Sequence, residues 1–326
     1  MRKVALALCA VILISTACKK SATTSSADEQ QAITRRSCGS YEVLQEQLKA
    51  DPSMRLRMEQ IENFTARVIQ SGRVTKGSTI EIPVVVHVLY NTPAQDIDDA
   101  QVQSQIDVLN EDYSAGNKDI RNTPSLFSTV TSSGFGVHFT LAQTRRVATR
   151  LKSFPANDAM KSTQKGGDDA VDPTKYLNMW SCNLGQNLLG YAQFPGGPTS
   201  TDGVVILYSA FGSRVKDPSG TFISTYDLGR TATHEIGHWM NLRHIWGDDN
   251  GSCSGSDLVD DTPNQASQNF GCPTFPHISC SNNGDMSMNY MDYTDDACMY
   301  MFSKGQQARA LAVFASGGPR AALAGN

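Results

Sequence analysis

The sequence has little excess of charge, no internal repeat and no apolar run long enough to cross a bilayer. Its 326 residues carry 28 Lys and Arg against 32 Asp and Glu, a net charge of −4 with a pI of about 5.9. This balance argues against binding to nucleic acid or to an anionic membrane. With 40% hydrophobic residues the chain can bury a core, so we expect one large domain with extensions.

The first residues are typical of a targeting segment. Arg2 and Lys3 precede the apolar stretch Val4–Ala17, which is shorter than the ~20 residues of a membrane-spanning helix but suits a signal peptide over residues 1–17. Ser15-Thr-Ala-Cys18 resembles a bacterial lipobox, with Ser15 where Leu is usual, and a lipid would then be attached to Cys18. An ordinary secretory signal is the alternative. We therefore expect an exported protein, either an outer-membrane or surface lipoprotein or an enzyme secreted after processing.

Histidine is scarce, with six in the chain, yet three of them lie within residues 234–244, which read His-Glu-Ile-Gly-His-Trp-Met-Asn-Leu-Arg-His. His234 and His238 are four apart, so on a helix their imidazoles project from one face and can share a zinc ion. Glu235 then lies beside the metal. His244 supplies a third nitrogen if the helix ends soon after His238, and an open fourth position for water is typical of catalytic zinc. The alternative is a surface helix that carries histidines by chance.

This stretch resembles the extended zinc motif of the metzincin metallopeptidases, and Gly237–Asp248 is most similar to the pappalysin branch. Asn241 stands where most metzincins have Gly, and Asn is the residue that best tolerates the left-handed conformation after Gly. The segment 289–293, Asn-Tyr-Met-Asp-Tyr, resembles the methionine-containing turn of these enzymes, with Met291 placed 47 residues after His244. The resemblance extends from about Thr79 to Gly317.

The resemblance implies an α+β, metzincin-like zincin fold, with a twisted mixed sheet, two long helices over an active-site cleft and a loop-rich C-terminal half. We expect a signal peptide at 1–17, a tether and propeptide at 18–54 and a catalytic domain at 55–326. Residue patterns predict strands near 80–90, 136–142, 176–181 and 203–208, and helices near 51–71, 98–113, 227–240 and 303–315. His87, inside the first strand, is expected to be a core histidine.

The expected activity is zinc-dependent hydrolysis of peptide bonds by a monomer, acting on a peptide or protein substrate. The histidines 234, 238 and 244 would hold Zn²⁺, and Glu235 would take a proton from the attacking water and pass it to the leaving amine. The resemblance implies that Met291 forms an apolar floor under the metal and that Tyr293 reaches the zinc or the oxyanion. The segment 190–197 is expected to lie along the cleft and pair with an extended substrate, beginning with Gly190, Tyr191 and Ala192. The alternatives are a catalytically weak zinc-containing adhesion lipoprotein and an enzyme of another metzincin branch.

Export implies an oxidising compartment, where cysteines form bridges. Four cysteines after the zinc motif permit three pairings, and the resemblance to pappalysins implies Cys253–Cys280 and Cys272–Cys298. The oxygen-bearing residues Asp257, Asp260, Asp261 and Thr262 crowd together before Pro263. Hard oxygen ligands at this density suit Ca²⁺, and the resemblance implies calcium near the cleft. We expect Asp257, Asp260 and Thr262 to be its ligands. A solvated acidic turn is the alternative.

Cys38, in Arg35-Arg-Ser-Cys-Gly39, lies upstream of the enzyme body and looks similar to the switch cysteine of pappalysin propeptides. Its thiolate would take the fourth zinc position and silence a zymogen. A disulfide to Cys182 is the alternative.

Asp296 is five residues after Met291, at a position that in some pappalysins lies in the pocket for the residue just after the scissile bond. A carboxylate there would prefer Arg, and to a lesser degree Lys. Asp295 could be the true partner, and a loop carboxylate bound to backbone amides is a further alternative. Cleavage before Arg55 or Arg57 would then release Cys38 from the zinc.

Overall fold

The fold is described from a computed structural model that covers residues 1, 33–72, 79–249 and 251–325. The expected lipobox, and nearly all of the expected signal peptide and tether, lie outside these residues. From Ile33 onward the chain forms one compact unit. Within the described ranges, no helix combines the length and apolar character needed to cross a membrane.

A five-stranded mixed sheet forms the centre of the unit, with its strands in the order β2-β1-β3-β5-β4. Neighbouring strands are parallel except for the edge strand β4, which is antiparallel to β5. The strands are β1 (Ile80–Tyr90), β2 (Val137–Ala148), β3 (Leu177–Cys182), β4 (Gly190–Ala192) and β5 (Val204–Leu207). The mixed sheet of the expected fold is thus confirmed. Its antiparallel edge strand, β4, lies next to Glu235 of the histidine motif.

Two of the strands differ from the sequence prediction. β2 continues to Ala148, six residues beyond the predicted end, because it pairs with β1 along its full length although its side chains are half-exposed. β4 was not predicted as a strand, since its three residues are too few to show any alternation. His87 is confirmed as a core histidine: it is fully buried in β1 and contacts Asp168 and Asn178 through its two ring nitrogens.

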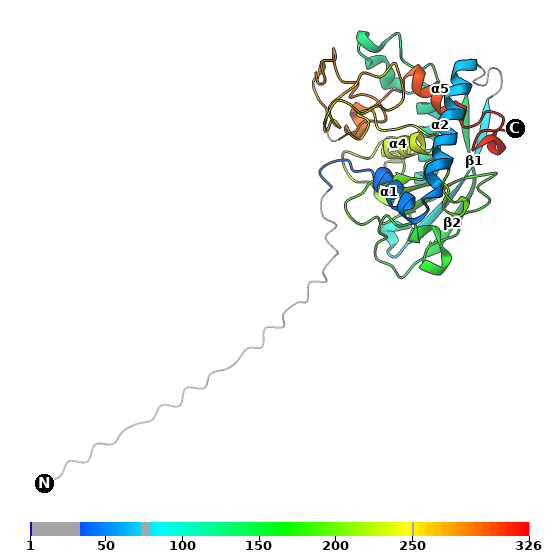
Figure 1. Cartoon of the computed structure of the whole chain (residues 1–326). Coiled ribbons are helices and arrows are strands. Elements are labelled where there is room, and N and C mark those ends of the chain that lie inside the picture. The colour runs from blue at the N-terminus through cyan, green and yellow to red at the C-terminus, as the bar shows by residue number, and fades with distance from the viewer. Residues whose placement is uncertain (2–32, 73–78, 250, 326) are drawn as a thin grey trace. The chain divides into compact units, whose positions relative to one another are not determined.

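Five α-helices surround the sheet in the part of the chain that the structure describes. They are α1 (Ser40–Ala50), α2 (Ser53–Ser71), α3 (Asp99–Tyr113), α4 (Arg230–Trp239) and α5 (Lys304–Ala312). α3 packs against β2 and α4, and α4 packs against β4 and β5. α1 lies against β4. α2 lies against α5, as Figure 1 shows.

The helix ends follow local chemistry. Asp98 caps α3 by accepting a hydrogen bond from the amide of Gln101, and Ser303 forms the predicted capping box with Gln306 at the start of α5. α4 begins three residues later than predicted, because Gly229 precedes it in the left-handed conformation. The prediction omitted α1, whose three buried residues form too narrow a stripe to stand out in the sequence.

The chain between α4 and α5 contains no α-helix or strand among its described residues. Two disulfides stabilise it, Cys253–Cys280 and Cys272–Cys298, the pairing that the resemblance implied. A second, smaller hydrophobic cluster lies in this half and includes Trp246, Tyr293 and the distant Cys38. Cys38, which precedes α1, is therefore part of the core of the loop-rich half.

Candidate metal centre

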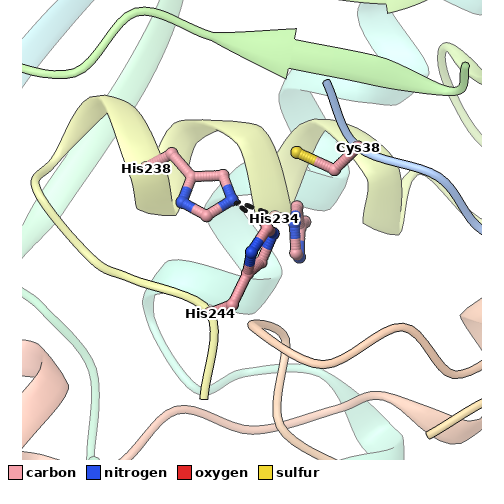
Figure 2. Close-up of side chains that lie close together, drawn as sticks. All are labelled: Cys38, His234, His238 and His244. Atoms are coloured by element: carbon pink, nitrogen blue, oxygen red, sulfur yellow. Dashed lines mark hydrogen bonds between the residues drawn. The ribbon is translucent and has the colours of Figure 1, made fainter. Parts of the chain in front are cut away.

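Three imidazoles and one thiol converge on a single point. The Nε2 atom of His238 lies 3.1 Å from Nε2 of His234 and 3.1 Å from Nε2 of His244. One donor atom from each of these residues and Sγ of Cys38 all lie within 4.8 Å of one another (Figure 2). Tetrahedral zinc with Zn–N bonds of about 2.0–2.1 Å would place its nitrogen ligands roughly 3.3 Å apart. The donor set therefore fits zinc.

His244 reaches this point because the helix ends where the sequence predicted. Asn241 adopts a left-handed conformation with φ of 73°, and the amide of Leu242 donates to the carbonyl of Gly237 at 2.9 Å. The chain then turns back beneath the helix. The ring of His244 stacks on Trp246, with 4.3 Å between the ring centroids.

The outer ring nitrogens of the two helical histidines contact backbone carbonyls. Nδ1 of His234 lies 2.6 Å from the carbonyl oxygen of Tyr290, and Nδ1 of His238 lies 2.8 Å from that of Leu242. A carbonyl can only accept, so each Nδ1 donates and each Nε2 keeps its lone pair for a metal. Burial lowers the pKa of both imidazoles, which keeps them neutral and able to bind a cation.

The third histidine has a charged partner instead. Nδ1 of His244 lies 2.7 Å from Oδ1 of Asp248, four residues later in the chain. Because a carboxylate accepts, His244 also donates from Nδ1, so Asp248 orients this ring and leaves its Nε2 free for a metal. Sequence reasoning did not assign Asp248 a role. Its spacing from the last histidine of the motif was the available signal.

Glu235 is fully enclosed beside the histidines, with 1% of its surface exposed. Its Oε2 accepts a hydrogen bond from Oγ of Ser40 at 2.9 Å and lies 3.3 Å from Sγ of Cys38. Burial raises its pKa to about 7, which suits a group that takes up and releases a proton near neutrality. A side chain at Gly190 would meet Glu235 at 2.9 Å, so the close approach of β4 to the glutamate requires glycine at this position.

Cys38 lies next to β4. The amide of Gly39 donates to the carbonyl of Gly190 at 2.9 Å, and the amide of Leu189 donates to that of Ser37 at 3.0 Å. This short pairing with β4 is parallel. Cys38 is a free thiol, as is Cys182 in the hydrophobic core, so the alternative disulfide between them is not formed.

The methionine turn lies under the helix. Met291 is fully buried, and a Cβ atom at Gly237 of α4 would lie 2.5 Å from its sulfur. Tyr293 follows two residues later, and its hydroxyl lies 3.3 Å from both the amide nitrogen and the carbonyl oxygen of Cys38. Met291 therefore packs against α4 and Tyr293 against the Cys38 segment, while the roles expected of both residues remain predictions.

Asp296 contacts an arginine from the N-terminal segment. Nη2 of Arg36 lies 2.5 Å from its Oδ1, and both side chains are buried. The same guanidinium donates from Nε to the carbonyl of Thr294 and from Nη1 to Oγ1 of Thr231, both at 3.1 Å, and it lies over the ring of Tyr226.

The other oxygen of Asp296 accepts from the backbone amides of Leu228 and Arg230 at 2.9 and 3.3 Å. The carboxylate thus binds the Arg36 side chain and two backbone amides together, and its role as a pocket for substrate remains a prediction. No such hydrogen bond joins Arg36 to the neighbouring Asp295.

The structure brings only some of the acidic residues before Pro263 together with Thr262. Thr262 donates to Oδ2 of the buried Asp257 at 2.8 Å, and burial raises the pKa of Asp257 to about 7. Asp261 instead accepts from Oγ of Ser303 and from the amide of Gly305 at the start of α5. Asp260 is exposed. Among the described residues, one group of three or more His, Cys, Asp or Glu side chains lies close enough together to hold a metal ion. It is the group of Cys38 and the three histidines.

The fold and this four-donor site together define a metallopeptidase, and comparisons with known proteins agree. A family model described as "Pregnancy-associated plasma protein-A" matches residues 161–315. Extracellular metalloprotease 1 of Coccidioides posadasii is 37% identical over 239 residues, which covers 71% of this chain and 75% of that protein. The extracellular metalloprotease of Pyricularia oryzae is 34% identical over 291 residues, with 85% and 88% covered.

Two solved structures from Tannerella forsythia are also similar. Mature mirolysin in complex with a cleaved peptide is 48% identical, with a TM-score of 0.72, and the match covers 76% of this chain and 96% of that one. A variant of promirolysin is 44% identical, with a TM-score of 0.80 and coverages of 89% and 97%. The chain belongs to the pappalysin family, and it is a metalloendopeptidase.

Proposed function

We propose that the chain is an exported zinc endopeptidase, made as a latent zymogen, that cleaves peptides before Arg and to a lesser degree before Lys. The observation that carries this proposal is the convergence of Cys38, His234, His238 and His244 within 4.8 Å. The glutamate and all three histidines are present. A non-catalytic adhesion protein therefore has no specific observation in its favour.

The site residues divide the chemistry among them. His234, His238 and His244 would hold the zinc ion, which when bound supplies a Lewis acid that polarises the scissile carbonyl and lowers the pKa of water. Glu235 accepts the proton of the attacking water and delivers it to the leaving amine nitrogen. The hydroxyl of Tyr293 donates a hydrogen bond to the oxyanion. In the present state this hydroxyl contacts the Cys38 backbone, so it becomes free only when the segment leaves.

Latency follows from the direction of the N-terminal segment. In a substrate, the residue held by Asp296 follows the scissile carbonyl. Here Arg36 is the residue at Asp296, and it precedes Cys38, which faces the histidines. The segment therefore runs opposite to a substrate. It fills the cleft without presenting a peptide bond to Glu235, while a thiolate at Cys38 supplies a fourth zinc ligand.

Activation requires a local unfolding step. The proposed cuts, before Arg55 or Arg57, lie in the first turns of α2, next to the fully buried Met54. Proteases bind extended chains, so these turns must unwind before cleavage. Because the cleft of the latent chain is filled by its own N-terminal segment, the cut is made by another copy of the enzyme. In support, the promirolysin match covers 89% of this chain and the mature mirolysin match 76%.

The test is a digest of a peptide library by the full-length chain after it has been allowed to mature. We expect cleavage before Arg, complete inhibition by 1,10-phenanthroline and a mature N-terminus that begins with Arg. A digest that favours apolar residues after the scissile bond would overturn the specificity and leave the zinc chemistry standing.

Calcium is proposed as a second ion, held by Asp257 and Thr262 with Asp260. The buried Asp257 carboxylate supports this proposal, since a nearby cation would offset the cost of its charge. EGTA should lower the thermal stability, and an unchanged melting temperature would refute calcium.

Export, a lipid at Cys18 and a monomeric state are further proposals. Export is supported by the relatives that carry the name extracellular metalloprotease. Mass spectrometry of the membrane fraction would show the lipid as added mass, and light scattering of the purified chain would report the oligomeric state.

A further inference from the structure

Ser40 makes contacts that its place in the helix does not explain. It is fully buried and is the first residue of α1. Its hydroxyl donates to Oε2 of Glu235 at 2.9 Å and accepts from the amide of Ala192 at 2.8 Å. Neither partner belongs to α1. Gly39 occupies the N-cap position of α1. The Ser40 hydroxyl bonds to groups outside this helix, so it is not a helix cap.

Both partners of the hydroxyl are groups that a reacting substrate needs. Glu235 is the proposed proton acceptor, and Ala192 is the last residue of β4, the strand along which an extended substrate is expected to pair. An unpaired polar group in a buried site is costly. The two hydrogen bonds of the Ser40 hydroxyl therefore stabilise the state in which the N-terminal segment covers Glu235 and β4.

We propose that the Ser40 hydroxyl is a second latch of the zymogen, which acts on the glutamate and the cleft strand while Cys38 acts on the metal. The inference rests on the proposed latency. The two latches lie two residues apart and both contact Oε2 of Glu235, the hydroxyl at 2.9 Å and the sulfur at 3.3 Å. The bond from the amide of Ala192 to the hydroxyl does not involve the sulfur. If the sulfur alone is removed, Glu235 is still hydrogen-bonded to Ser40 and the amide of Ala192 in β4 is still occupied.

The two latches are linked by their shared contact with Glu235 and by direct contact with each other. Sγ of Cys38 lies 3.1 Å from the Ser40 hydroxyl and 3.4 Å from the Ser40 amide. The amide contact survives replacement of the side chain, so Ser40→Ala leaves a backbone donor for the sulfur. Alanine is also smaller than serine and favours helix, so this variant should keep α1 and the fold intact.

The experiment compares four full-length, zinc-loaded zymogens: the wild type, Ser40→Ala, Cys38→Ala and the double variant. The initial rate on a fluorogenic peptide with Arg after the scissile bond is measured while mass spectrometry shows the chain to be uncut. Glu42→Ala, in the exposed part of the first turn of α1, controls for general loosening of the helix. Cobalt replaces zinc in parallel samples, in which a sulfur-to-cobalt absorption band reports the Cys38 ligand.

Ser40→Ala should keep the sulfur band and raise the residual rate roughly ten- to a hundredfold, the range expected for hydrogen bonds to a charged group. It should also raise the rate in the Cys38→Ala background, by a different factor because the two residues are in contact and share Glu235. Glu42→Ala should match the wild type.

Rates that do not rise when Ser40→Ala is added to either background would overturn the second latch. Loss of the sulfur band in Ser40→Ala would overturn it too, because Ser40 would then act only by holding Cys38. If the wild type has no sulfur band and Cys38→Ala stays as silent as the wild type, the proposed cysteine switch fails instead. The Ser40 effect would still be visible in the rates.

Discussion

Arg36 and Asp296 form a buried ion pair across 260 residues of sequence, with Nη2 2.5 Å from Oδ1. The arginine belongs to the segment that carries Cys38, and the aspartate belongs to the loop after the methionine turn. The pocket that would select arginine in substrates thus already holds an arginine of the chain itself. This pair anchors the segment next to the proposed zinc site.

Asp296→Asn should reduce kcat/KM of the matured enzyme for Arg peptides by roughly ten- to a hundredfold, because a neutral amide replaces the carboxylate that pairs with guanidinium. Cleavage of peptides with apolar residues at that position should change little. Asp295→Asn is the matched control and should keep the preference for Arg. Equal losses in the two variants would contradict the assignment of the pocket to Asp296.

Glu235→Gln should lower kcat roughly 10²- to 10⁴-fold while the protein keeps its zinc, because the amide cannot accept the proton of the attacking water. Peptide kinetics and zinc content by elemental analysis are measured on the same sample. A variant with full zinc and undiminished turnover would remove Glu235 from the mechanism.

Asp248→Asn should weaken zinc binding roughly ten- to a hundredfold, because the amide can turn its N–H toward His244 and oppose the tautomer that leaves Nε2 free. Competition with a chelator gives the affinity, and the visible spectrum of the cobalt form reports the geometry of the ligands. Asp107→Asn, on the exposed side of α3, is the control. Identical affinities for the two variants would show that Asp248 does not position His244.

Loss of the Cys272–Cys298 disulfide, through Cys272→Ser with Cys298→Ser, should cost about 2–5 kcal/mol of unfolding free energy. It should also raise KM for Arg peptides, because Cys298 shares a 3₁₀ turn with Asp296. Removal of Cys253–Cys280 should lower stability without this change in KM. Thermal denaturation and peptide kinetics check the two halves of this prediction, and an unaltered KM in the first variant would contradict the link to Asp296.

The convergence of the three histidines and the end of their helix could be predicted because they depend on neighbours in sequence. His234 and His238 are one turn apart, and Asn241 turns the chain by its own backbone preference. The long strand β1 was also visible from its apolar run. The methionine turn required the family resemblance, since a single Met291 in a polar loop carries no signal by itself.

The contacts of the N-terminal segment could not be predicted from the sequence in the same way. Arg36 meets Asp296 and Ser40 meets Glu235 over separations of 260 and 195 residues, and no local periodicity encodes such pairs. The three-residue strand β4 is defined by its partners, β5 and the Cys38 segment. Ser40 in particular looks like an ordinary small residue at the start of a helix until Glu235 is placed beside it.

The most direct test of the central claim is X-ray absorption at the zinc edge on the intact, full-length protein and on its matured form. A latent enzyme held by Cys38 predicts three nitrogen ligands and one sulfur at about 2.3 Å in the intact chain. The sulfur should be replaced by a light ligand after maturation. A zinc ion surrounded only by nitrogen and oxygen in the intact chain would contradict the account.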